Sequence, residues 1–408
     1  MVQTPGGTQA PSPPAEAAGG RIPELDGLRA LMALWLVVVH AGQLSGLAEA
    51  DSPVVRLLLT GQARVHVFMM LSGFVIGALL ARRRPPYGRF LRDRAARLFP
   101  IWLLALGLAV ALRPLQAEVY AGALWIGEDL RASMLSRIAL ESEQLPWHLL
   151  AHAALLHGLV PEQWLPQSDM ALLGPGWSLS AIWQFYLVAP LLPLLMFRWR
   201  LAVVAWIALP LLHPAFVEAA ALAGLSFGYA TLLEHLPLFL IGMATAQLLP
   251  ALRALPPEAL RAALGVGWAV AALAALGRAD RVGALLLWMP LIIWTLALWA
   301  VLDREAALAR AGRAVLAAPP LRALGGPSYA LFLLHLPLLN LVAWLCAGSG
   351  AERAGPLAWG LWLTLAGGTL SVAAAVALHR CVELPVDGWL RGPPGERQAA
   401  AGETAVIS

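Results

Sequence analysis

Lysine is absent from this chain of 408 residues, and charged residues of every kind make up only 13% of it. A soluble domain carries about a quarter charged residues, so this composition excludes a cytosolic enzyme and a disordered scaffold. The two cysteines, Cys346 and Cys381, offer neither a disulfide framework nor the spacing of a metal site. They are typical of small apolar packing residues.

Apolar residues take the place of charge. They form 60% of the chain, and the mean hydropathy is +0.71. One soluble core cannot bury so much apolar surface, so lipid must be the solvent for most of it. The apolar runs are long and continuous, which excludes an outer-membrane barrel with its alternating pattern. An isoelectric point of about 9.6 suggests nucleic acid only on a soluble surface, so we expect no nucleic-acid partner.

Ten apolar segments are candidate membrane helices, and the sequence therefore predicts an all-α, polytopic membrane protein. Some segments are shorter than a span of ~20 residues and need tilting or burial among neighbours. A weaker stretch, 147–160, holds three histidines and is expected to be short or re-entrant. The predicted spans are 31–47, 66–81, 98–113, 177–197, 201–217, 232–249, 262–277, 283–302, 327–346 and 357–379.

The arginines indicate how these helices are oriented. With the N-terminus in the cytoplasm, the inner segments hold 20 arginines and the outer segments hold 8, which together make the 28 basic residues of the chain. This bias is the positive-inside signal, and an even number of helices leaves both termini in the cytoplasm. We expect a multi-pass protein of the inner (plasma) membrane of a bacterium.

The two ends of the chain differ from its middle. Residues 1–20 are rich in Pro, Gly, Ala and Ser and lack an apolar run, so they are interpreted as a disordered tail and not as a secretory signal. Residues 391–408 are interpreted in the same way. Residues 21–390 are the predicted membrane domain, in which no internal repeat indicates the two halves of a transporter.

The first predicted helix combines a cation with an imidazole. His40 follows Arg29 by eleven residues, a spacing that returns to within ~20° of the same helix face and rises ~16 Å. An ionisable residue inside the bilayer is costly and is a functional candidate by default. The pair could hold the phosphates of a large cofactor at one end and carry out proton chemistry at the other. The alternative is a snorkelling Arg29 and a His40 bonded to a neighbouring helix.

Seven arginines occupy 82–97, just before the third predicted span. Ordinary topology-setting charge accounts for Arg82–Arg84. Arg94 and Arg97 approach the apolar segment more closely, and their R-x-x-R spacing puts both on one face of the helix. They could clamp phosphates.

Two further segments contain polar residues within apolar runs. Ser72-Gly73 inside a span predicts close packing of two helices. In 174–190 the aromatic residues suit a membrane interface, whereas Ser178, Ser180 and Gln184 add polarity that a simple anchor does not need.

The last two predicted spans carry the remaining candidates. Ser328, Tyr329 and His335 share one span, and Glu383 stands at the end of the next. A lone histidine in a membrane is often a packing partner, but two, His40 and His335, favour a shared polar cavity.

Taken in order, several segments resemble the acyltransferase 3 family of integral membrane acyltransferases. The Arg-x10-His helix, the R-x-x-R, the WSLS…QFY segment and the SYxxFLxH segment are specific in this order, although none is decisive alone. The likeness covers about 21–390. Its segments are LDGLRALMALWLVVVH, FMMLSGFVI, RDRAARLFP, WSLSAIWQFYLVAP, SYALFLLHLP and VELP.

The resemblance implies a ten-helix bundle that takes an acyl group, commonly acetyl, from acyl-CoA on the cytoplasmic side. Such proteins pass it to a hydroxyl of a carbohydrate or another secondary product, with no permanently bound cofactor and no metal. Arg29 and His40 match the family's first-helix pair. Arg94 and Arg97 match its R-x-x-R, whose arginines are thought to engage the nucleotide end of the donor.

Two features depart from the family pattern. The family usually has a glutamate after W-S-L-S-x, and here that position is Ile182. The change could mark an altered mechanism, a subfamily variant, an inactive relative or an engineered substitution, and Glu383 is expected to lie at the wrong end to replace the carboxylate. Some relatives also continue into a soluble hydrolase-like domain, so we expect transfer in this chain to finish inside the membrane domain.

These points give a hypothesis for the reaction. Arg29, Arg94 and Arg97 hold the phosphates of CoA, and the thioester reaches His40. His40 then takes the proton of the acceptor hydroxyl as a base, or forms a transient acyl-histidine.

Ser328, Tyr329 and His335 are expected to orient the acceptor or to stabilise the oxyanion. The acceptor itself is not identified, and the long acidic outer loop 114–176 is where we expect its selectivity. The rival hypothesis is a non-enzymatic membrane carrier of a lipid-linked sugar or small product, and a third is an inactive relative that binds CoA without turnover.

Overall fold

The computed structural model describes residues 22–192, 212–276 and 281–390. The predicted tails, 1–20 and 391–408, lie outside these residues. The described part is all-helical, with 81% helix and no strand, which confirms the predicted fold class. The long apolar runs explain this, because a backbone in lipid must satisfy its own hydrogen bonds, and a helix does so within one segment.

Within the described ranges, seven helical segments are long and apolar enough to cross a membrane, as expected of a multi-pass membrane protein. They match seven of the ten predicted spans. In chain order they are α1 (Pro23–Leu44), α2 and α3 (Pro53–Leu59 and Gln62–Arg82), α4 (Tyr87–Gly122), α10 (Leu232–Ala254), the part Leu285–Leu302 of α12 (Arg281–Leu302), α15 (Ser328–Leu345), and α16 with α17 (Pro356–Leu378 and Leu384–Leu390).

The other three predicted spans are not among these seven segments. The span predicted at 177–197 begins as α7 (Trp177–Val188) and then passes out of the described residues at 193. Most of 201–217 lies outside them too. The span at 262–277 corresponds to α11 (Pro257–Leu276), which is long enough but is not among the seven candidates. The count of ten and the orientation of the termini therefore stay predictions.

Shorter helices connect the long ones. Between α4 and α7 lie α5 (Glu128–Glu143) and α6 (Leu145–Ala153), the second of which is the short helix expected in 147–160. Between α12 and α15 lie α13 (Ala307–Leu316) and α14 (Pro319–Gly325).

Glycines bring α3 and α10 into close contact. A Cβ added at Gly73 would lie 2.0 Å from the carbonyl oxygen of Phe239, and one added at Gly242 would lie 2.0 Å from that of Met70. No larger residue fits at either position without moving the backbone. The close packing predicted from Ser72-Gly73 is confirmed.

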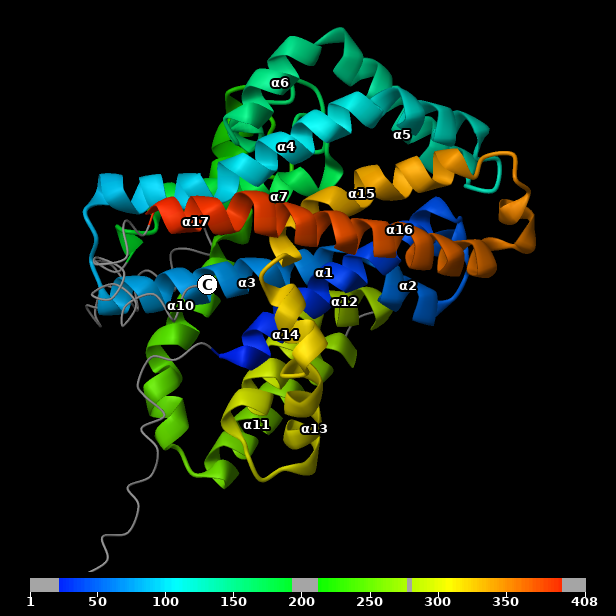
Figure 1. The fold of residues 1–408 in the computed structure, drawn as a ribbon. Coiled ribbons are helices and arrows are strands. Elements are labelled where there is room, and N and C mark those ends of the chain that lie inside the picture. Colours follow the sequence, from blue (N-terminus) through cyan, green and yellow to red (C-terminus); the bar gives the residue numbers. More distant parts are fainter. Residues whose placement is uncertain (1–21, 193–211, 277–280, 391–408) are drawn as a thin grey trace, which may run out of the picture.

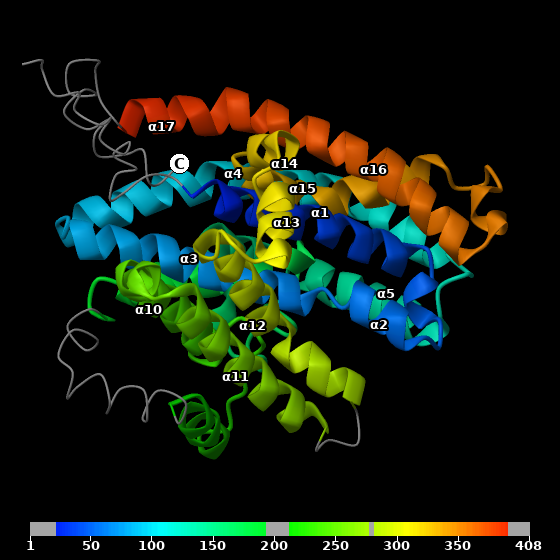
Figure 2. The ribbon, with the colours of Figure 1, turned by 90° about the horizontal axis from the view of Figure 1, so that it is seen from below.

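The long helices lie in a sequence of layers that places α1 in the interior. α1 packs against α3, α14, α15 and α16, while α15 lies between α16 and α4. Figure 2 shows this order, from α16 and α17 at the top to α10, α11 and α12 below. Figure 1 shows α4 running beside α17 at one end and toward α5 at the other.

Candidate functional site

A cavity of about 480 Å³ lies where α1, α3, α4, α7, α15 and α17 meet. This volume is in the range of small-molecule sites, about 300–1,000 Å³. The cavity contains both charged and aromatic side chains. It is the place where most of the residues singled out in the sequence come together.

All three candidate phosphate-binding arginines line this cavity. Arg29 comes from α1, and Arg94 and Arg97 come from the first turns of α4. The side chain of Arg94 is buried, and its Nε has no hydrogen-bond partner. Arg97 Nε lies 3.3 Å from Asp387 Oδ1 of α17. A buried guanidinium with an unsatisfied donor beside an open space is suited to bind an anion.

The two intramembrane histidines form a pair. The ring centroids of His40 and His335 are 5.0 Å apart. His40 Nδ1 lies 2.9 Å from the side-chain oxygen of Gln43, and His335 Nδ1 lies 3.2 Å from the carbonyl oxygen of Leu331. Because both partners are acceptors, each Nδ1 donates, and in a neutral ring the Nε2 then carries the lone pair. The sequence predicted that these two histidines share a polar cavity, and the structure places their rings side by side.

The cavity and the histidine pair are neighbours but are not one open space. α1 is continuous from Arg29 to His40, so the predicted rise of ~16 Å applies. Neither histidine lines the cavity, which reaches as far as Phe68 and Phe332. These two rings are 5.6 Å apart, and Phe332 is 6.3 Å from the ring of His335. The cavity therefore ends short of the histidine pair, and Phe332 lies next to both.

Ser328 and Tyr329 line the cavity, but their hydroxyl protons are already engaged. Ser328 Oγ donates to the carbonyl oxygen of Gly325, and Tyr329 Oη donates to that of Leu98, each at 2.8 Å. Each hydroxyl therefore presents lone pairs and no free proton. Their predicted role in stabilising an oxyanion would require each of them to leave its backbone partner, and it stays a prediction.

The side chains of α7 have two different roles. Ser180 accepts a hydrogen bond from Gly158 N at 3.1 Å, and Gln184 bonds the backbone of Ala230 and Leu232 at 2.9 Å each. These two side chains hold loops in place. Ser178 and Ile182 line the cavity instead, so the departure from the family pattern falls inside the site.

The expectation that Glu383 lies at the wrong end is wrong. Glu383 and Ile182 line the same cavity, because α16 continues through a π-helical turn, His379–Glu383, whose first and last residues belong to the lining. His379 Nδ1 donates to Glu383 Oε2. π-turns are frequent at functional sites. Sequence reasoning missed His379 and Gln43 as site residues. The i,i+4 spacing of His379 from Glu383 was the signal for the first, and the position of Gln43 three residues after His40 was the signal for the second.

Another cluster of histidines does not line the cavity. The rings of His152 and His157 stack with centroids 4.0 Å apart, and both stack on Trp102 of α4. Among the residues that the structure describes, no group of three His, Cys, Asp or Glu could hold a metal ion. The site around the cavity thus offers cations, imidazoles and carboxylates as its chemical groups.

Comparison with known proteins bears on this geometry. A family model described as an acyltransferase domain, that of the acyltransferase 3 family, matches residues 22–380. The acyltransferase MdmB of Streptomyces mycarofaciens is 30% identical over 179 residues, which are 42% of this chain and 39% of that protein. A protein of Rhizobium radiobacter, named protein 2 in picA locus, is 38% identical over 91 residues, 21% of this chain and 43% of that protein.

The matched regions thus span about two fifths of the length of each of these relatives. No solved structure matches the chain. The family match covers nearly all of the described helices, including those that carry the arginines and the histidine pair. The chain belongs to the acyltransferase 3 family.

Proposed function

We propose that this protein is a membrane O-acyltransferase. It moves an acyl group, commonly acetyl, from acyl-CoA to a hydroxyl of a carbohydrate or of a glycosylated or secondary-metabolite acceptor. The observation that carries the proposal is the convergence of Arg29, Arg94 and Arg97 on one cavity that ends beside the His40–His335 pair. A cationic cavity next to neutral imidazoles matches a polyphosphate donor with a distant reactive end.

The arginines bind the nucleotide end of the donor. Arg94 supplies a buried donor that has no protein acceptor, and a phosphate oxygen would satisfy it. Arg97 releases Asp387 and binds a phosphate group instead. The Asp387 carboxylate then no longer occupies the place that the phosphate takes. Arg29 holds the nucleotide end of the donor near the start of α1. The pantetheine arm then follows this helix toward His40.

The reaction needs one base and one leaving group. The acceptor hydroxyl oxygen bonds to the thioester carbonyl carbon while His40 Nε2 takes the hydroxyl proton. The C–S bond then breaks, and the imidazolium returns its proton to the departing thiolate, so the products are an ester and free CoA. The hydrogen bond from Nδ1 to Gln43 holds the ring in the tautomer that this step requires.

The aromatic pair limits access to the histidines. Phe68 and Phe332 turn aside before a thioester reaches His40 in this proposal, because both rings line the cavity and Phe332 lies next to His335. A closed path in the absence of donor also keeps water away from the reactive centre.

The arginine bias supports an orientation in the membrane. The cavity then opens to the cytoplasm of a bacterial cell, where acyl-CoA is made, and both termini lie on that side. The two relatives come from a Streptomyces and a Rhizobium, which supports a bacterial plasma membrane.

The direct test is CoA release from acetyl-CoA by the purified protein in detergent. Wild type should release CoA, and His40→Ala and Arg29→Ala should not. His66→Ala is the matched control, because His66 is also a histidine of a membrane helix but bonds Tyr229 at 2.9 Å, away from the pair. Unchanged release from His40→Ala would remove histidine from the mechanism.

Donor binding separates this function from a carrier or an inactive relative. CoA should raise the unfolding temperature of the enzyme, because a ligand that binds only the folded state stabilises it. A carrier needs no acyl-CoA and should show no shift. An inactive relative should show the shift without releasing CoA.

A further inference from the structure

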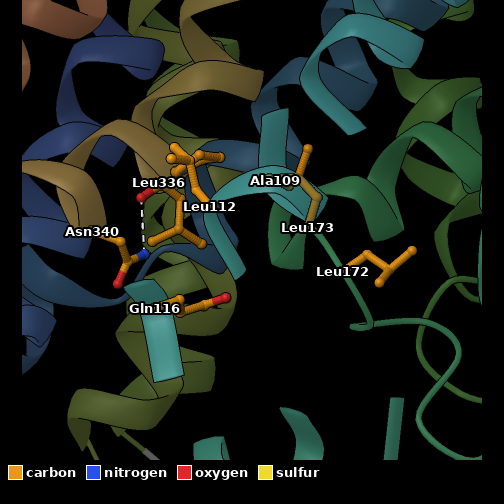
Figure 3. A pocket seen from close by; sticks show the side chains of 8 residues that line it. Ala109, Leu112, Gln116, Leu172, Leu173, Leu336 and Asn340 are labelled. Carbon is orange, nitrogen blue, oxygen red and sulfur yellow. Dashed lines mark hydrogen bonds between the residues drawn. The ribbon is translucent and has the colours of Figure 1, made fainter. Parts of the chain in front are cut away.

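The large cavity contains one titratable pair, His379 and Glu383, that the proposed reaction does not use. A smaller pocket farther along α4 and α15, which Gln116 and Asn340 help to line, has a volume of about 10 Å³ (Figure 3). It has room for one water molecule, so of these two spaces only the large cavity can take a larger ligand. His379 and Glu383 line that cavity together with the three arginines.

Glu383 holds the imidazole of His379 in one orientation. His379 Nδ1 donates to Glu383 Oε2, and the two residues are the first and last of the π-helical turn. A carboxylate that accepts from Nδ1 offsets the charge of an imidazolium ring, in which Nε2 carries a proton and is a donor. The side chain of His379 is 23% exposed, and it belongs to the lining. The pair therefore gives the cavity a fourth group that can be cationic.

Two glycines fix the position of this imidazole. A Cβ added at Gly326, just before α15, would lie 2.8 Å from His379 Nε2. One added at Gly325 would lie 2.8 Å from Asp26 Cβ of α1. Arg29 follows Asp26 by about one turn of that helix. His379 Nε2 thus lies against the junction of α14 and α15, near the part of α1 from which Arg29 enters the cavity.

The fold sets the order of the cations along the cavity. α15 runs from Ser328 toward His335, and α16 packs against α15 and returns toward its start. Figure 2 shows α17 continuing past α14. His379 is therefore level with the start of α15. Asp387, which bonds Arg97, lies eight residues or ~12 Å farther along the helix. The pair Arg97–Asp387 is thus farther from His335 than His379 is.

CoA carries its phosphate groups in the same order. The diphosphate joins the pantetheine arm to the ribose, and the 3′-phosphate lies beyond the ribose. When the thioester is directed toward the histidine pair, the diphosphate lies level with the nearer cations and the 3′-phosphate reaches the farther ones.

We propose that His379 is a further donor-binding residue, whose imidazolium binds the diphosphate of CoA through Nε2 beside Arg29. The inference rests on the proposed function. Glu383 is a positioning residue, because it orients the imidazole and offsets its charge. Asp387 acts in the opposite sense, because it occupies Arg97 and competes with the donor. Two carboxylates about one turn apart on one helix therefore have opposite effects on donor affinity.

The direct test measures binding without turnover. Dissociation constants of CoA and of 3′-dephospho-CoA are measured at pH 6.5 by isothermal titration calorimetry, with the purified full chain in detergent. His379→Ala should weaken both ligands by the same factor, at least about tenfold, because both contain the diphosphate and one hydrogen bond to a charged group contributes this much. A loss for CoA alone would place His379 at the 3′-phosphate, and no loss for either would remove it from donor binding. Both results contradict the proposal.

Arg380→Ala is the matched control. Arg380 is an exposed cation of the same π-helical turn and does not line the cavity, so its removal lowers the charge nearby without removing a contact. We expect both dissociation constants to change less than about twofold. A loss as large as that of His379→Ala would reduce the effect to the general charge of this face, against the proposal. If His379→Ala does not fold, His379→Gln takes its place with the same expected result.

The pH dependence separates an imidazolium from a packing role. Histidine ordinarily changes charge between pH 5 and 8, and 3′-dephospho-CoA lacks the phosphate monoester that titrates near pH 6. Wild-type affinity for it should fall at least about fivefold from pH 6 to 8.5, and that of His379→Gln should stay within about twofold. The charged or titratable groups around His379 in the lining are Arg29, Arg94, Arg97, Tyr329, Glu383 and Asp387. A pH dependence that persists in His379→Gln would come from one of these and contradict the proposal.

The two carboxylates give a test by sign. Glu383→Gln and Asp387→Asn remove the same charge from the cavity. Glu383→Gln should weaken CoA binding at least about threefold, because the imidazolium loses its counter-charge, whereas Asp387→Asn should strengthen it at least about twofold, because Arg97 becomes available. Equal changes in the same direction would show that the cavity responds to net charge alone, and the assigned roles would be wrong.

Pyrophosphate distinguishes a failure of this inference from a failure of the proposed function. A wild type that does not bind CoA defeats the proposed donor. If pyrophosphate then still raises the unfolding temperature of the wild type but not of His379→Ala, the diphosphate site stands. If pyrophosphate has no effect on a wild type that does not bind CoA, the site fails together with the donor.

Discussion

The large cavity and the histidine pair are built on the same helices but have opposite character. The cavity is wide and charged, with three arginines, two carboxylates and an imidazole in its lining. The histidine pair has no charged hydrogen-bond partner, because each Nδ1 is bonded to a neutral oxygen. Phe332 lines the cavity and lies next to His335.

This difference shows how one bundle can separate binding from chemistry. Recognition of a polyphosphate needs fixed cations and access to water, whereas a neutral base in a membrane needs their absence. Along one continuous helix, α1, a distance of ~16 Å is sufficient to meet both requirements.

The largest expected effect comes from removing the base and leaving the cavity unchanged. His40→Ala should lower CoA release at least ~100-fold, the order of magnitude that general base catalysis contributes. The CoA-dependent rise in unfolding temperature should remain, because no cavity residue has changed. Loss of both properties in His40→Ala would show that the two regions are not separable. His66→Ala should behave like wild type in both assays.

The reverse change removes a cation from the cavity. Arg94→Ala should raise the KM for acetyl-CoA at least about tenfold, a loss of ~1.4 kcal/mol of binding, and abolish the CoA-dependent stabilisation. Arg94→Lys should restore it only partly, because an ammonium lacks the planar fork of donors. Arg83→Ala, at an exposed position before α4, is the control. A lower kcat at unchanged KM would contradict a binding role.

A substitution in the aromatic pair should weaken the separation between the cavity and the histidine pair. Phe332→Leu shortens the side chain that stands next to His335, so water should reach the histidines more easily. We expect hydrolysis of acetyl-CoA without acceptor to rise about threefold relative to transfer, because enzymes exclude water to suppress this side reaction. The control is Phe239→Leu, a buried phenylalanine of α10 that stacks on Phe185. An unchanged ratio would show that the aromatic pair does not limit access.

A smaller effect is expected from Ile182→Glu. The substitution adds the carboxylate that the family pattern has, but Glu383 already contributes one to the same cavity. We therefore expect CoA release to change less than about threefold, whereas the double variant Ile182→Glu, Glu383→Gln should regain what Glu383→Gln alone loses. A large rise from Ile182→Glu alone would mean that position 182 has a requirement that Glu383 cannot meet.

A change outside both regions should affect stability alone. Asp303 accepts hydrogen bonds from Arg261 Nε at 2.7 Å and Trp299 Nε1 at 2.9 Å, and Arg261 holds the pKa of this carboxyl well below its ordinary value of 3.8. A depressed pKa in the folded state gives stability that is present above pH 3.8 and is lost as the pH falls below it.

Asp303→Asn should therefore lower the unfolding temperature at pH 7 and reduce its decline below pH 4, with the KM for acetyl-CoA unchanged. Thermal unfolding followed across this pH range checks the prediction. An altered KM would connect the loop between α12 and α13 to the site.

Several parts of this structure could be predicted from the chain alone. The apolar runs locate the seven long helices, and the spacing of Arg29 from His40 and of Arg94 from Arg97 puts each pair on one helix face. Helix ends were less predictable. α4 begins at Tyr87, eleven residues before the predicted span 98–113, and there Tyr87 donates to the carbonyl oxygen of Leu187 and Phe90 is buried, contacts that no local pattern contains.

The placement of Glu383 shows the same limit from the opposite side. Its position at the end of a span was correct, but the expectation that this end is the wrong one was not, because the π-helical turn after α16 places Glu383 in the cavity that Ile182 lines. Hydrophobic periodicity describes one helix at a time and contains no information on which helices are neighbours.

Composition and spacing by themselves determined that this protein is a helical membrane bundle with arginines at one level and histidines at another, because lipid allows few alternatives to an apolar helix and a helix has a fixed pitch. Only the tertiary structure decided that the three arginines share a cavity, that His40 meets His335, and that the cavity ends short of these histidines. These contacts join helices that are far apart in the sequence, and their geometry depends on packing between side chains that no single segment specifies.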